Sequence, residues 1–247
     1  MTRLPGTDVE IELIAKGQGG FAPIFYQSPG PGAAMASVNA GNSVDLYVGG
    51  AGINGGFARA LAGQTLSAYE ARHKALVQQV RGGGAPHITY EDEDPTAFSL
   101  LNADRPLTDR SMSHDGICFV DIFGPGLPPA GVAENAGMIY VASPFGGNFA
   151  TEERFLAAIA TLAETIVLTV GTYNALKKPA GLPDLEVVRL CLYGSGIYNT
   201  HGTPAPGIAR AILQGVTRGL SHQACGITTI QVPDDDPWHL ALTEPTA

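Results

Sequence analysis

The sequence predicts an α/β layered fold with a largely parallel central sheet, on two observations. Short runs rich in apolar and β-branched residues alternate along the chain with longer segments whose apolar residues recur every three or four positions. Two of the strand-like runs end in glycine-rich turns that lead into helical segments, as strands of parallel sheets do. The expected strands cover residues 9–15, 35–38, 117–123, 138–142, 187–193 and 227–232.

Helix signals lie between these strands. Ser67 and Glu70 have the spacing of a capping box, in which each side chain bonds a backbone amide at the start of a helix. The segment 152–173 places apolar residues on one stripe, and Pro206 suits the first turn of another helix. The expected helices cover residues 57–61, 67–80 and 152–173, with a fourth that begins near Pro206.

The chain of 247 residues is expected to form one domain, residues 1–247, because it shows neither an internal repeat nor an interdomain linker. The polar stretch 91–114 lacks sustained periodicity and is expected to be a surface excursion. The residues after Trp238 are expected to form a loose C-terminal tail.

Charge limits the class of ligand. The net charge of −9 argues against non-specific binding to nucleic acid or to an anionic membrane, because both need clustered lysine and arginine. It does not exclude a small anionic ligand, since backbone N–H groups and helix N-termini can hold a phosphate. We therefore expect no nucleic-acid partner and no membrane partner.

The three cysteines, Cys118, Cys191 and Cys225, are far apart and lack CxxC spacing, which argues against a disulfide framework or a zinc site. We expect buried free thiols and no metal. The sequence shows no signal peptide and no apolar run of membrane-spanning length. A cytoplasmic location is the expectation, and secretion by a route without a signal peptide stays open.

The segment 37–63 carries two asparagines and a series of glycines between a short apolar strand and a helix. Glycine lets backbone amides converge on an anion without a side chain in the way, and a helix N-terminus adds partial positive charge. The spacing matches neither common phosphate-loop motif, so a tight structural turn stays an equal alternative. The positions concerned are Asn39, Asn42, Gly49, Gly50, Gly52, Gly55 and Gly56.

A second strand, glycine-rich turn and helix follow at residues 192–206, in the sequence LYGSGIYNTHGTPAP. The strand ends at Tyr193, and Gly194, Ser195 and Gly196 make the turn. Two such loops at the carboxyl ends of parallel strands form a common ligand crevice in open α/β sheets. Together they suggest a diphosphate held from both sides.

These two loops resemble the ligand loops of macro domains. The sequence VNAGNS…GGAGINGGFARALAG resembles the first loop, which reads V-N-A-A-N and continues into a glycine run and a helix. GSGIYNTHGTP resembles the second loop, and AENAGMIYVASPFGGN resembles a strand and turn that lie between the two in the family. The order matches over most of residues 35–220. The resemblance implies a three-layer α/β/α fold with a mixed, largely parallel sheet and no cofactor.

The resemblance also implies the ligand and its contacts. Members of the family bind ADP-ribose, and some hydrolyse an ADP-ribosyl linkage on a protein side chain or on a small conjugate. By position, Asn42 would bind the distal ribose, with the ring of Tyr198 beside it. The implied ligand-binding set is Asn39, Gly49, Gly50, Gly52, Ile53, Gly55, Gly194, Ser195, Gly196, Ile197 and Tyr198.

The sequence departs from the hydrolytic members of the family in its first loop. Those members have an aspartate and, four residues on, a histidine, where this chain has Asn54 and Ala58. Asparagine cannot accept a proton, so the usual catalytic carboxylate is missing. Asp45, in a loop two residues wider than usual, is the nearest substitute, and the alternative for it is a solvated loop residue. The candidate catalytic residues are Asn42, Asp45 and Asn54.

The leading interpretation is a mono-ADP-ribosyl hydrolase, with ADP-ribose or an ADP-ribosylated protein as its partner. A non-catalytic reader of ADP-ribosylated proteins or of free ADP-ribose derivatives is the alternative, and a crevice for another nucleotide is a third. The family's adenine-binding aspartate has no counterpart after the first strand, so Glu10 or Glu12 stays open in that role. His201 lies in the second loop and is a further candidate for a catalytic role. The pair His114 and Asp115 precedes a strand and is a candidate proton relay, with a loop hydrogen bond as the alternative.

Overall fold

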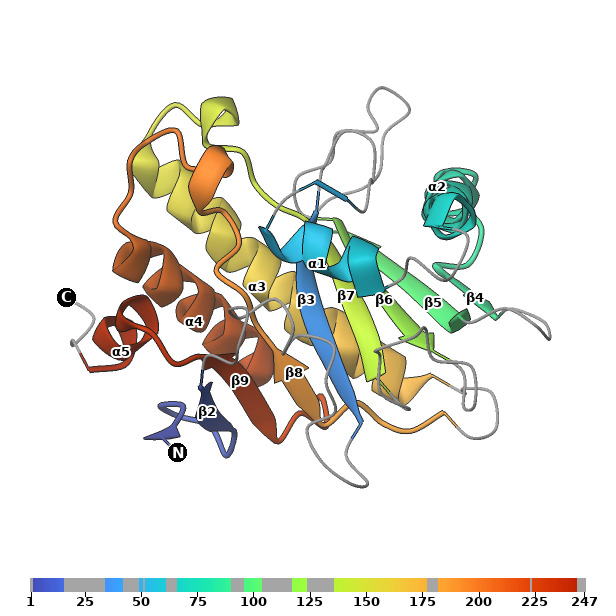
Figure 1. Cartoon of the computed structure of the whole chain (residues 1–247). Helices are drawn as coiled ribbons and strands as arrows, with labels where there is room; N and C mark the ends of the chain where they lie inside the picture. The colour runs from blue at the N-terminus through green and yellow to red at the C-terminus, as the bar shows by residue number, and fades with distance from the viewer. Residues whose placement is uncertain are drawn as a thin grey trace.

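A nine-stranded sheet of order β1-β2-β9-β8-β3-β7-β6-β5-β4 forms the middle of the protein (Figure 1). The structure, a computed structural model, describes residues 2–15, 34–41, 49–50, 52–60, 66–89, 96–103, 117–123, 136–176, 182–222 and 224–243. The strands from β2 to β7 in this order pair in parallel, and the pairs at both edges are antiparallel. The predicted α/β fold with a largely parallel centre is therefore confirmed.

The strands have the following bounds: β1 (Thr2–Arg3), β2 (Glu10–Ile14), β3 (Met35–Gly41), β4 (His87–Thr89), β5 (Thr96–Ala103), β6 (Ile117–Phe123), β7 (Ala136–Ala142), β8 (Val187–Arg189) and β9 (Thr229–Pro233). The helices are α1 (Gly52–Ala60), α2 (Leu66–Arg81), α3 (Glu152–Ala175), α4 (Ala205–His222) and α5 (Asp236–Thr243).

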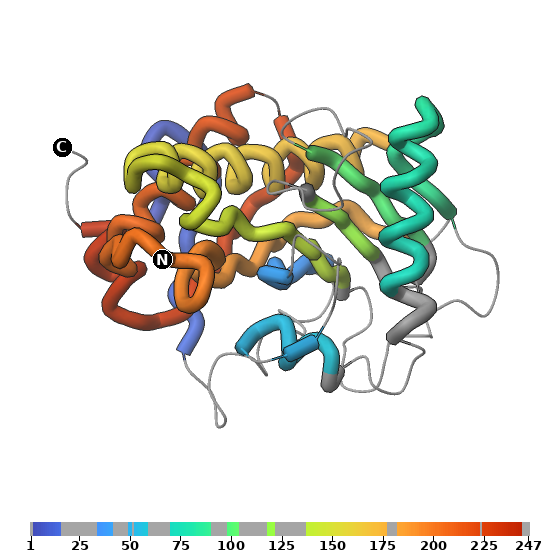
Figure 2. Tube along the Cα trace, turned by 90° about the horizontal axis from the view of Figure 1, so that it is seen from above, coloured from blue at the N-terminus to red at the C-terminus, as the bar shows by residue number. Residues whose placement is uncertain are grey.

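Helices cover both faces of the sheet. Helices α3 and α4 lie on one side of it and α1 on the other (Figures 1 and 2). Residues paired across neighbouring strands point to the same face, so Asn39, Tyr140 and Phe119 share one face. Asn54 of α1 contacts Asn39, and His73 of α2 stacks on Phe119. Both α1 and α2 therefore cover this face, opposite α3 and α4.

The core between the sheet and α3 is apolar. Alternate strand residues Val38, Ile139 and Val120 are fully buried on the α3 face. The stripe predicted on α3 is confirmed, since Phe155, Ile159, Leu162 and Ile166 are all fully buried. Among the described helices, α3 alone is long and apolar enough to cross a membrane, and 61% of its apolar window is buried inside the protein, as in a core helix.

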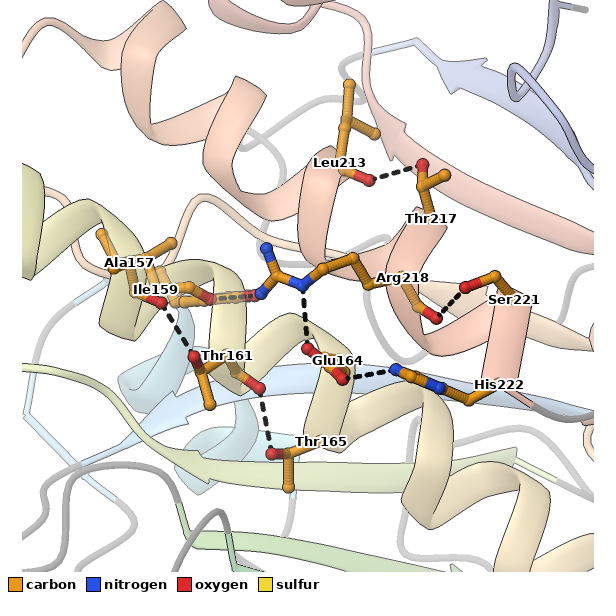
Figure 3. Close-up of polar contacts among 11 residues, drawn as sticks. Ala157, Ile159, Thr161, Glu164, Thr165, Leu213, Thr217, Arg218, Ser221 and His222 are labelled. Atoms are coloured by element: carbon orange, nitrogen blue, oxygen red, sulfur yellow. Dashed lines mark hydrogen bonds and ion pairs between the residues drawn. The ribbon is translucent and has the colours of Figure 1, made fainter.

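Helices α3 and α4 pack closely against each other. A Cβ atom at Gly215 would lie 1.9 Å from the carbonyl oxygen of Ala160, so only glycine fits there. Figure 3 shows a polar link at the rim of this contact, where Glu164 of α3 accepts from Arg218 Nε at 2.9 Å and from His222 Nε2 at 3.1 Å. Because Arg218 and His222 are about half exposed, close backbone packing contributes more here than charge pairing.

The structure differs from the expected elements in several places, among them β8, which ends at Arg189, four residues before the expected end at Tyr193. Residues 96–103 of the expected excursion form β5, in which Phe98 and Leu100 are buried; the rest of 91–114 lies outside the described residues. Helix α5 continues past Trp238 to Thr243, so the chain is not loose directly after Trp238. Helix α1 begins at Gly52, five residues earlier than expected. Its first turn contains glycines, which are weak helix formers and give little helical signal in the sequence.

Candidate functional site

The first loop connects the carboxyl end of β3 to α1. Gly50 and Gly52 have φ angles of +77° and +65°, which favour glycine over any other residue. Gly49 is buried, and α1 starts directly at Gly52 with its N-terminal amides at this end of the sheet. The candidate catalytic residues Asn42 and Asp45 lie outside the described residues.

Asn54 is directed at the sheet. Its Oδ1 accepts a hydrogen bond of 3.0 Å from Nδ2 of Asn39, and both side chains are buried. Asn39 Nδ2 also lies 3.4 Å from the sulfur of Met138, while Asn39 Oδ1 has no hydrogen-bond partner in the described part of the chain. The Asn39–Asn54 bond thus ties α1 to β3 beneath the first loop.

The second loop follows β8. Its turn is held from inside, since the amide of Gly194 donates to Ser143 Oγ at 2.9 Å and Ser195 Oγ donates to the Leu192 carbonyl at 2.6 Å. Gly194 and Gly196 have φ angles of +78° and +63°. A 3-10 turn, Gly196–Tyr198, lies in the middle of the loop and leaves Ile197 85% exposed.

The two loops lie against each other. β3 and β8 are neighbouring parallel strands, so their carboxyl ends meet at one edge of the sheet. The hydroxyl of Tyr198 donates to the carbonyl of Gly41, the last residue of β3, at 3.3 Å. The Tyr198 ring also packs edge-on against Phe145, with 6.4 Å between ring centroids. The structure therefore brings the described parts of the two sequence-predicted loops into one site.

Comparison with solved structures decides the fold. A macrodomain of Oceanobacillus iheyensis with MES bound superposes with a TM-score of 0.55, covering 98% of this chain and 92% of that one at 14% identity. A mutant of the same macrodomain with ADPR gives a TM-score of 0.54, at 15% identity. A Trypanosoma brucei macrodomain in complex with ADP gives 0.50, covering 96% of this chain and 70% of that one at 14% identity. The chain has the macrodomain fold.

The chain is also similar in sequence to curated proteins of parasites. It is 30% identical over 217 residues to the DNA/RNA-binding protein ALBA4 of Plasmodium falciparum, covering 82% of this chain and 57% of that protein. It is 25% identical to mitochondrial association factor 1 form b0 of Toxoplasma gondii, covering 83% of this chain and 50% of that protein. The chain thus spans about half the length of these relatives. No protein-family model matches it.

Other candidate residues of this macrodomain fold have structural partners. His201 Nε2 lies 3.0 Å from the carbonyl oxygen of Gly146, and its ring packs on Phe155. Glu12 accepts from Gln231, which in turn accepts from Arg189 Nε at 2.9 Å. The pair His114 and Asp115 lies outside the described residues.

Sequence reasoning missed a buried polar cluster formed by residues of β5, β6 and α2. Asp121 of β6 bonds His73 Nε2 at 2.8 Å and accepts a short hydrogen bond from Ser99 of β5. The His73 ring stacks on Phe119, with 4.1 Å between centroids, and the side chains of His73 and Asp121 are 1% exposed. The available signal was the single acid in the apolar strand sequence ICFVDIF, since a buried carboxylate needs partners.

The cysteines of the fold are buried free thiols, as expected. Burial raises the pKa of both Cys118 and Cys191 to about 12, which leaves them protonated at neutral pH. A thiol in that state is a poor nucleophile, so neither cysteine is suited to covalent catalysis.

Proposed function

We propose that this chain binds ADP-ribose, with the diphosphate held between the two glycine-rich loops. The observation that carries the proposal is the pair of loops at the carboxyl ends of β3 and β8, joined by the Tyr198–Gly41 hydrogen bond. Two of the solved macrodomains whose fold this chain shares hold ADPR or ADP.

The chemistry of the loops supports an anion bound by backbone. Residues 49–50, 52–58 and 192–200 carry no charged side chain. Gly50, Gly52 and Gly196 have positive φ and open space where a Cβ atom would lie, so a ligand can approach their backbone, whereas the amide of Gly194 is bonded to Ser143 Oγ. Backbone amides and the N-terminus of α1 then provide the positive electrostatic potential that a diphosphate needs.

A nucleotide-sized ligand fits this chain better than a nucleic-acid polymer. Binding to DNA or RNA draws most of its affinity from clustered lysine and arginine, and this chain has a net charge of −9. The relative named as a DNA/RNA-binding protein is much longer than the matched region, which covers 57% of it. We therefore propose a role in ADP-ribose recognition for this segment.

Hydrolysis of an ADP-ribosyl linkage is the finer proposal, and it depends on Asp45. In this mechanism a water molecule attacks the anomeric carbon of the distal ribose as the bond to the modified group breaks. Asp45 accepts a proton of the water and passes it to the departing group, which leaves with the bonding electron pair. The wider loop after Asn42 favours Asp45 in this role. Asn54 cannot act as the base, because an amide accepts no proton and its Oδ1 is bonded to Asn39. Without a base, the same crevice would make the protein a reader of ADP-ribosylated proteins.

Two measurements test these proposals in order. Titration calorimetry with ADP-ribose should give micromolar binding, about −8 kcal/mol, and the absence of both heat and a thermal shift would contradict the binding proposal. Incubation with a mono-ADP-ribosylated protein should then release ADP-ribose, and Asp45→Asn should slow release about 10²-fold or more while binding persists. Intact binding without release over a long incubation would identify a reader.

A further inference from the structure

Gly41 is packed against the ring of Tyr140. A Cβ atom added at Gly41 would lie 2.1 Å from Tyr140 Cζ and 2.3 Å from the Tyr140 hydroxyl oxygen. Ordinary contacts between carbon atoms are about 3.5–4.0 Å, so an alanine at this position would overlap the ring by more than 1 Å. With tyrosine at position 140, glycine is the residue that fits at position 41.

The Tyr140 ring has little room to move away. Tyr140 is fully buried on β7, between β3 and β6. Its ring centroid lies 5.3 Å from that of His73 and 6.1 Å from that of Phe119. His73 is itself held by Asp121 and stacked on Phe119. Because this cluster backs the ring, a larger residue at position 41 must be accommodated by movement of the β3 end.

The end of β3 is the point where the two ligand loops meet. The carbonyl of Gly41 accepts from Tyr198 of the second loop, and the next residue along the chain is Asn42, the expected ribose ligand. A displacement of Gly41 by about 1 Å therefore changes the start of the first loop and its distance from the second. Geometry at this scale matters, since a misplacement of about 1 Å in a preorganised site can lower the rate of its reaction about 10²-fold.

We infer that Gly41 and Tyr140 are a size-matched pair that positions the first ligand loop against the second. Tyr140 is a buried positioning residue, which acts through the backbone of Gly41. This inference rests on the proposed binding of ADP-ribose.

A double-mutant cycle with two readouts tests the pair. The variants are Gly41→Ala, Tyr140→Leu and both together, each measured for ADP-ribose affinity by calorimetry and for melting temperature. In the presence of Tyr140, Gly41→Ala should weaken ADP-ribose binding more than tenfold. In the Tyr140→Leu background, Gly41→Ala should lower the ADP-ribose affinity less than threefold, because leucine leaves space for the new methyl group.

Gly219→Ala is the matched control, since its Cβ also meets an obstacle, Val167 Cβ at 2.7 Å, in the α3–α4 contact but about two helical turns along α3 from Ile159, which packs on Gly194 of the second loop. It should lower the melting temperature and leave the ADP-ribose affinity of the folded protein unchanged. The inference is wrong if Gly41→Ala lowers only the melting temperature, as the control does. It is also wrong if Gly41→Ala lowers the ADP-ribose affinity by the same factor with tyrosine and with leucine at position 140. If the wild type does not bind ADP-ribose, the proposed function fails, and the melting temperatures alone decide whether positions 41 and 140 are coupled.

Discussion

The Tyr198 hydroxyl donates to the Gly41 carbonyl at 3.3 Å, joining residues 157 positions apart in the sequence. This is a direct hydrogen bond between the two ligand loops, one from the end of β3 and the other from the turn after β8. For the ADP-ribose site that we propose between the loops, this bond would set the distance between them before the ligand binds.

Removing that hydroxyl should weaken ligand binding more than it weakens the fold. Tyr198→Phe keeps the edge-on contact with Phe145 but loses the bond, so we expect ADP-ribose affinity to fall about three- to tenfold in calorimetry. Tyr173→Phe is the control, because it loses a comparable hydroxyl bond to the Pro183 carbonyl, far from the crevice. Equal affinities for the two variants would contradict the bridging role.

The backbone of the second loop should be sensitive to a side chain. Gly196 has φ of +63° and open space around it, so Gly196→Val strains the backbone without a clash and should weaken ADP-ribose binding at least tenfold. Gly83→Val carries the same strain, at φ of +79° with open space, in the turn after α2. Both variants should lose about 1–2 kcal/mol of stability. An unchanged ADP-ribose affinity of Gly196→Val would count against ligand binding by the backbone of the second loop.

The hydrogen bond between Asn54 of α1 and Asn39 of β3 should stabilise the folded protein. Asn54→Ala removes the acceptor of a buried Asn39 amide, so we expect a loss of about 1–3 kcal/mol in the free energy of unfolding by urea. Asn54→Asp keeps the acceptor and should retain more of that stability at neutral pH. Gln214→Ala, on the exposed face of α4, should change the free energy by about 0.5 kcal/mol or less. Equal stability of all three variants would show that the Asn39–Asn54 hydrogen bond does not stabilise the fold.

Buried thiols predict how stability depends on pH. In the folded protein the pKa of Cys118 and of Cys191 is about 12, against 9.0 in the exposed chain, so above pH 9 the unfolded state binds fewer protons. Their contribution is fully present below about pH 9 and decreases as pH rises toward 12. Urea unfolding of the wild type between pH 8 and about pH 10.5 should therefore show a steeper loss of stability than the variant with Cys118→Ala and Cys191→Ala. Parallel curves would show that the thiols do not titrate in this way.

The sequence predicted the central strands and the long helices because those elements are strongly patterned. Strand β5 was missed because its sequence, TAFSLLNA, mixes polar and apolar residues, and it is recognised only once it pairs with β6. The start of α1 was missed because glycines are weak helix formers, so Gly52 gave no helical signal.

At the candidate site, the sequence predicted which loops meet but not which way their side chains point. The direction of Asn54 depends on the buried amide of Asn39, fifteen residues away and on another element. The cluster of Ser99, Asp121 and His73 depends on strand register, which brings two strands and a helix together at one point. Neither relationship is encoded in local spacing.

The neighbouring position of β3 and β8 has a consequence for how the site forms. Met35 pairs with Val187, so the edge that carries both loops is completed only when distant parts of the chain have joined. Contacts of such long sequence separation are slow to form in folding. ADP-ribose binding would therefore report completed assembly of the sheet, and a chain shortened before residue 187 would lose the ligand site even where its early strands and helices remain.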